Sequence, residues 1–153
     1  MRLFAPNNIN VAVLSDIAKG EKGKVEKLRR EEVLNAAQFF TVADFLDRDE
    51  ADVEDLFGAS LYADLVTKAY GLRSDLALTA EKLAEADNTT PRVVKQAEAA
   101  FRLMPPDIPE FSHYTPAEWL LRNPAFLDGE DPWILACLGR FEAIAERYNS
   151  MLP

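Results

Sequence analysis

The feature that most constrains this chain is a short apolar run near its N-terminus, followed at once by an acidic turn. Residues 9–14 are rich in Val and Ile, which is typical of a strand buried on both faces in a parallel sheet. Ser15 and Asp16 end the run, and a lysine-rich segment with helical character follows Gly20. Ligands of open α/β sheets usually bind beyond the carboxyl ends of strands. Asp16 is therefore the first candidate for chemistry.

A second strand is predicted over residues 38–42, with a helix over 21–34 between the two strands. This order forms one right-handed βαβ unit. From Ala59 the pattern becomes helical, with an apolar face that ends before Gly71. We expect an α/β fold, in which a small, partly parallel sheet over residues 1–58 is followed by a helical subdomain over 59–153.

The helical part carries several start signals. The predicted N-caps are Thr79, Thr90, Thr115 and Asp131, and Pro91, Pro116 and Pro132 follow three of them at the first helical position. The last helix has an apolar stripe: Ile134, Leu138, Phe141, Ala145, Tyr148 and Leu152. This stripe suits packing onto the domain core, or a seam with a partner helix, because it is too short for a sustained coiled coil.

The charge balance argues against a dedicated nucleic-acid binder. The 153-residue chain has a formal net charge of −9, whereas proteins that hold nucleic acid alone usually show a basic footprint. The basic residues that do cluster, between Lys19 and Arg30, are interleaved with glutamates. They form either a solvated helix face laced with ion pairs or a phosphate-contacting face. We expect DNA binding to be weak, or to require a larger assembly.

Cysteine usage and hydropathy point to a compartment. Cys137 is the single cysteine, so an internal disulfide is excluded and a reducing compartment is favoured. No apolar run approaches the roughly 20 residues that a membrane span needs. The first residues lack the core of a signal peptide. We expect a cytoplasmic protein without a membrane partner.

Two motifs that resemble functional sites lack the residues that such sites need. Gly20-Glu-Lys-Gly-Lys24 superficially resembles a phosphate-binding loop, but Ala18 and Val25 stand where the Walker pattern needs Gly and Ser or Thr. We therefore expect no nucleotide site. His113 is the single histidine, and nothing in the sequence pairs it with a nucleophile or a zinc ligand. A structural role near a helix start is predicted for it.

Carboxylates remain as the candidates for a metal site. Asp16 follows the first predicted strand, and Glu54 and Asp55 follow the second. Loops after parallel strands open on the same edge of a sheet, so these three side chains could converge on Mg²⁺, which prefers oxygen ligands. The alternative is that such residues cap helices.

Several segments together resemble the C-terminal region of OLD-family ATP-dependent endonucleases, which join an ABC-type ATPase to a TOPRIM nuclease domain. The resemblance rests on Val13-Leu-Ser-Asp16, Ala51-Asp-Val-Glu-Asp-Leu-Phe57 with Tyr62, Phe111-Ser-His-Tyr-Thr-Pro-Ala117, and Leu138-Gly-Arg-Phe-Glu142 with Tyr148-Asn149. The order of these segments, rather than any one of them, carries the resemblance, which spans about residues 9–152.

The resemblance implies a Mg²⁺-dependent TOPRIM site, but this sequence departs from the family pattern. Asp16 matches the first residue of the Asp-x-Asp pair, whereas Ala18 stands at the second. The glutamate strand and the ATPase would precede Met1. Two functions therefore stay open. One is a C-terminal fragment or degenerate relative of such a nuclease, inactive alone and dependent on an ATPase portion or neighbouring protein. The other is a non-catalytic interaction or dimerisation module. In either case a homo-oligomer is expected.

Overall fold

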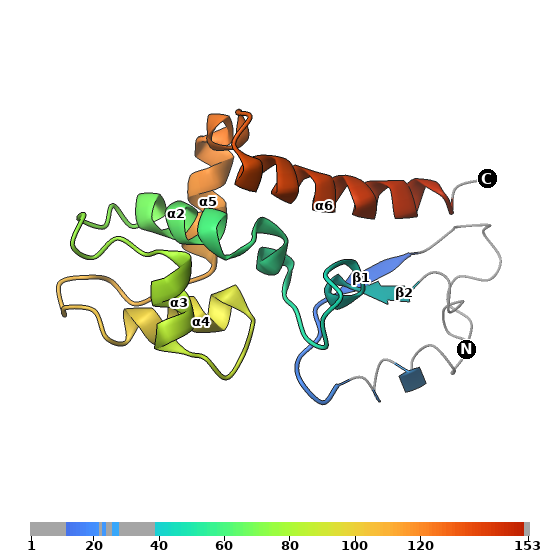
Figure 1. The fold of residues 1–153 in the computed structure, drawn as a ribbon, viewed down its shortest axis with the longest axis horizontal. Coiled ribbons are helices and arrows are strands. Elements are labelled where there is room, and N and C mark those ends of the chain that lie inside the picture. Colours follow the sequence, from blue (N-terminus) through green and yellow to red (C-terminus); the bar gives the residue numbers. More distant parts are fainter. Residues whose placement is uncertain (1–11, 22, 24–25, 28–38, 152–153) are drawn as a thin grey trace. The chain divides into compact units, whose positions relative to one another are not determined.

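The computed structural model describes residues 12–21, 23, 26–27 and 39–151. Its elements, drawn in Figure 1, are two strands, five helices and three 3₁₀ turns in the described part of the chain. They are β1 (Val13–Ser15), β2 (Phe39–Thr41), η2 (Val42–Phe45), η3 (Val53–Phe57), α2 (Ala59–Ala69), α3 (Ala80–Ala86), α4 (Val93–Phe101), α5 (Tyr114–Arg122), η4 (Pro124–Leu127) and α6 (Pro132–Asn149).

The strands pair as the sequence predicts. β1 and β2 are parallel, with Val13 opposite Phe39 and Ser15 opposite Thr41. Among the described residues of the two predicted strands, Ala12 lies before β1 and Val42 belongs to η2. Residues 9–11, Gln38 and most of the predicted helix over 21–34 lie outside the described residues. The mixed α/β class, with a small parallel sheet and a helical part, is confirmed.

Contacts divide the chain into two compact units. Unit 1 comprises the described residues up to Val53 together with those from Arg140 onward, and unit 2 is Glu54–Gly139. The sequence predicts one boundary near residue 58, whereas this division falls at residue 53 and assigns the second half of α6 to unit 1.

Unit 1 is built around the sheet. Phe39, Phe40 and Thr41 of β2 are all buried. The Phe40 ring contacts the ring of Tyr148 edge-on, with centroids 5.3 Å apart, and the Arg147 guanidinium lies 5.7 Å from the Phe40 centroid. Burying aromatic side chains on both sides of a short strand compensates for the small number of strands.

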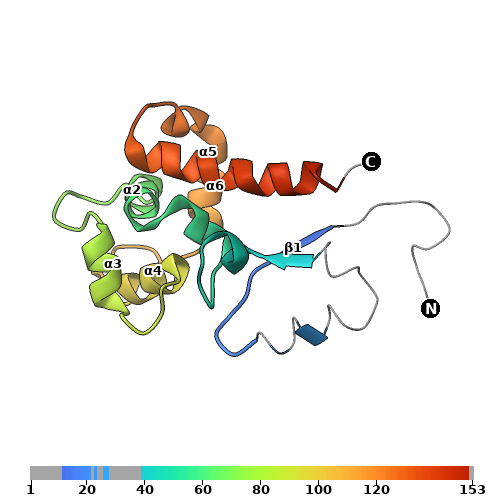
Figure 2. The ribbon, with the colours of Figure 1, turned by 45° about the vertical axis from the view of Figure 1, so that its right-hand side comes forward.

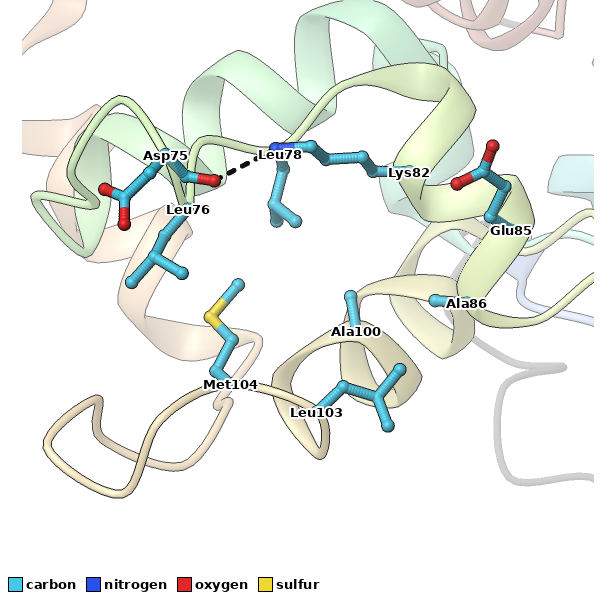
Figure 3. Close-up of a pocket in the computed structure, with 9 residues that line it drawn as sticks. All are labelled: Asp75, Leu76, Leu78, Lys82, Glu85, Ala86, Ala100, Leu103 and Met104. Carbon is cyan, nitrogen blue, oxygen red and sulfur yellow. Dashed lines mark hydrogen bonds between the residues drawn. The ribbon is translucent and has the colours of Figure 1, made fainter.

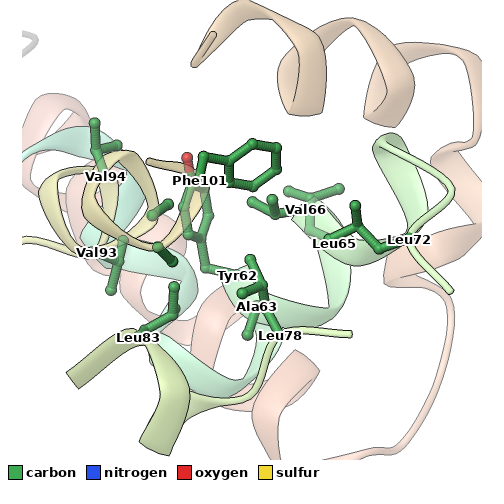
Figure 4. Close-up of a cluster of buried hydrophobic side chains, with 12 residues drawn as sticks. Tyr62, Ala63, Leu65, Val66, Leu72, Leu78, Leu83, Val93, Val94 and Phe101 are labelled. Carbon is green, nitrogen blue, oxygen red and sulfur yellow. The ribbon is translucent and has the colours of Figure 1, made fainter. Parts of the chain in front are cut away.

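Unit 2 holds a continuous hydrophobic core, shown in Figure 4. Helix α2 turns Tyr62, Leu65 and Val66 inward, and α3 packs against α4. Figure 2 shows α2, α3 and α4 of this unit from a second direction. The buried members of the core are Tyr62, Ala63, Leu65, Val66, Leu72, Leu78, Leu83, Val93, Val94, Ala97, Ala100 and Phe101. The apolar face predicted from Ala59 onward is the face that this core uses.

Residues at the helix termini explain where α2 ends and where α3 and α6 begin. Gly71 has a φ of 58°, a conformation that glycine adopts without strain, and it follows the end of α2. The Thr79 hydroxyl accepts a hydrogen bond from the Lys82 N–H at 3.3 Å and caps α3. The Asp131 carboxylate accepts from the Trp133 N–H at 2.8 Å and caps α6. The predicted caps at Thr79 and Asp131 are therefore confirmed.

The start of α5 differs from the prediction. The expected capping box places Thr115 before the helix, but α5 begins at Tyr114, so Thr115 lies within it. The residue at the cap position is His113, whose side chain makes no capping hydrogen bond. The Pro116 side chain is fully buried, so packing of this turn outweighs the local capping signal.

Candidate functional site

Asp16 lies directly after β1, where the sequence places it. Its carboxylate is exposed, and Oδ1 accepts a hydrogen bond from the Val53 N–H at 2.9 Å, across 37 positions of sequence. The adjoining Ile17 forms an antiparallel bridge with Ala51. Asp16 therefore secures the chain that returns past the end of the sheet.

Asp55 contacts the start of α4, a contact that the sequence does not predict. Its side chain is 1% exposed, and Oδ1 accepts from the Val93 N–H at 2.9 Å. Val93 is the first residue of α4, so this carboxylate satisfies an unpaired N–H at a helix start and lies at the positive end of the helix dipole. Glu54, the preceding residue, is half-buried in η3.

The three predicted metal ligands do not fall in one compact unit. Asp16 belongs to unit 1, whereas Glu54 and Asp55 belong to unit 2. Within the described residues, no group of three or more His, Cys, Asp or Glu side chains is placed to hold a metal ion. We therefore derive no metal-dependent step. In the described residues, the carboxylates of Asp16 and Asp55 act as acceptors for backbone N–H groups.

His113 and Cys137 lie on different helices and differ in burial. His113 is exposed at the start of α5, with its ring centroid 4.2 Å from that of Tyr114. Cys137 is fully buried in α6. His113 lies at the start of a helix, as predicted, but its side chain makes no capping hydrogen bond, so its structural role stays a prediction.

A surface feature that the sequence did not reveal is an apolar face on α5. Tyr114, Ala117 and Leu121 are exposed and lie at spacings of three and four residues, so they share one side of the helix. Tyr114 is 74% exposed and Leu121 is 84% exposed. We call these three residues the α5 face. The opposite side of α5 packs Trp119 and Leu120 against the core of unit 2.

Charges beside the α5 face are balanced. The Arg122 guanidinium donates to the Glu118 carboxylate one turn away. An exposed ion pair of this kind adds little stability, but it leaves no net charge next to the apolar residues. The face therefore combines large exposed apolar side chains with one charge of each sign on the same helix.

Other large apolar side chains are also exposed in unit 2. Leu103 is 80% exposed after α4, and Trp133, Leu135 and Leu138 of α6 are 58%, 53% and 42% exposed. Single exposed apolar residues are common on proteins.

Comparisons with protein-family models, curated proteins and solved structures find no match to this chain. Of the helices in the described residues, none has the length and apolar content needed to cross a bilayer. The argument about function therefore rests on the geometry above.

Proposed function

We propose that this chain is a non-catalytic protein-interaction module that forms a two-fold dimer through the α5 face. The observation that supports the proposal is the exposure of Tyr114 and Leu121, at 74% and 84%, on one side of a helix whose other side is packed on the core. As part of this proposal we place the protein in the cytoplasm, because a lone cysteine is typical of a reducing compartment.

A second copy suits this face because the face is self-complementary. Tyr114 and Leu121 are two turns apart, with the small Ala117 between them. When two copies of α5 cross in opposite directions, Ala117 allows close approach at the crossing, and Tyr114 of one copy lies beside Leu121 of the other. A two-fold axis closes such a contact, and two-fold dimers are the commonest oligomers.

Light scattering after size exclusion tests the dimer. We expect the 17.1 kDa chain to elute at twice its monomer mass, and Leu121→Asp to elute as a monomer because a buried unpaired carboxylate is costly. Leu103→Asp is the matched control, since Leu103 is comparably exposed but lies outside α5. A wild-type monomer at high micromolar concentration, or a Leu121→Asp dimer, would contradict the proposal.

As a second candidate, we propose that the chain is a C-terminal fragment or degenerate relative of an OLD-type TOPRIM nuclease, inactive alone. One observation favours it: Asp16 is exposed directly after a strand of a parallel sheet, the position at which such sheets usually bind ligands. In this case an ATPase portion or a neighbouring protein would complete the assembly, with Mg²⁺ held in part by Asp16.

Plasmid cleavage separates the two candidates. The isolated chain, incubated with plasmid and Mg²⁺ or Mn²⁺, should leave the DNA intact and bind it weakly at physiological salt. Co-expression with the gene product encoded immediately upstream should produce cleavage only under the nuclease candidate, and Asp16→Asn should then abolish it. If the isolated chain nicks the plasmid and Asp16→Asn abolishes the nicking, both candidates are wrong, because each of them treats the isolated chain as inactive.

A further inference from the structure

We draw no further inference here: the strongest candidate, the open apolar hollow between α3 and the end of α4 (Figure 3), carries charges of both signs at its rim, and nothing in the structure shows what covers it.

Discussion

Unit 1 and unit 2 each contain an aspartate that performs the same task in opposite surroundings. Asp16 and Asp55 both accept a backbone N–H from about 37 residues further along the chain, at 2.9 Å. Asp16 does so at the surface beside the sheet, while Asp55 does so when 1% exposed under the start of a helix. A hydrogen bond in water competes with solvent, whereas breaking a buried one leaves a group with no replacement partner. Although the two hydrogen bonds have the same length, removing Asp55 is therefore expected to lower the free energy of unfolding more than removing Asp16.

The surrounding apolar packing differs in the same sense. Unit 2 has a continuous core formed by α2, α3 and α4. In unit 1, β2 is buried, but β1, which directly precedes Asp16, has three half-buried residues. How deeply a side chain is buried, more than its residue type, decides how much its truncation lowers the free energy of unfolding. Three predictions follow this contrast between the units.

The largest effect is expected from truncating the core of unit 2. Leu83→Ala removes a side chain that is fully buried, and it should lower the free energy of unfolding by about 2–5 kcal/mol. Leu14→Ala, in half-buried β1, is the comparison variant and should cost clearly less. Urea denaturation followed by circular dichroism measures both. Equal losses would show that β1 is packed as tightly as the helical core.

An intermediate effect is expected at the two aspartates. Asp55→Ala leaves the buried Val93 N–H without its acceptor and should destabilise the protein by about 1–3 kcal/mol, whereas Asp16→Ala should cost less than about 1 kcal/mol. Asn retains an acceptor oxygen, so Asp55→Asn should recover part of the loss and separate the hydrogen bond from the charge. The same urea midpoints provide the test. A larger loss at Asp16 than at Asp55 would reverse the comparison.

The smallest effect is expected at Asp87, an exposed carboxylate in unit 2. Hydrogen bonds from the Thr89 hydroxyl and N–H, at 2.6 and 2.9 Å, hold the pKa of Asp87 below its ordinary value of 3.8. A lowered pKa in the folded state stabilises the protein above pH 3.8, and this contribution disappears as the pH falls through the folded-state value. The stability difference between wild type and Asp87→Ala should therefore be small at neutral pH and shrink in acid. A difference that grows on acidification would contradict this assignment.

Local patterns predicted the elements that depend on nearby residues. The helix from Ala59 and the caps at Thr79 and Asp131 are confirmed, because periodicity and capping act within one or two turns. The parallel pairing of the two strands is also confirmed, since a strand-helix-strand order permits little else.

Packing overrode local signals in two helices. Thr90-Pro91 predicts the start of α4, but the helix begins at Val93, where Asp55 supplies the cap from another element. In α6, Leu138 and Ala145 of the predicted apolar stripe are exposed, which contradicts packing of the whole stripe onto the core. The alternative, a seam with a partner helix, stays a prediction, and Leu152 lies outside the described residues. The inward side instead contains Ile134, Cys137, Phe141, Ile144 and Tyr148, which are buried or half-buried. Two neighbouring stripes with the same spacing are present in this helix, and only the neighbours it meets select one.

The candidate surfaces were least visible before the fold was known. Sequence patterns single out neither Leu121 nor Leu103, because the type of an apolar residue in a helical segment does not show which side of the helix will be covered. Nothing in the spacing of residues 75–104 indicates that α3 and the end of α4 line a common, open hollow. The carboxylates that spacing did single out, Asp16 and Asp55, contact backbone N–H groups about 37 positions away.

Composition, turn residues and periodicity were enough to establish the α/β class, the position of the helical part and the acidic character of the protein, because these follow from each residue and its near neighbours. The partners of Asp55, the inward side of α6 and the exposure of Leu121 were decided by tertiary packing. Burial and hydrogen-bond pairing depend on which distant segments arrive at a residue, and no short stretch of sequence contains that information.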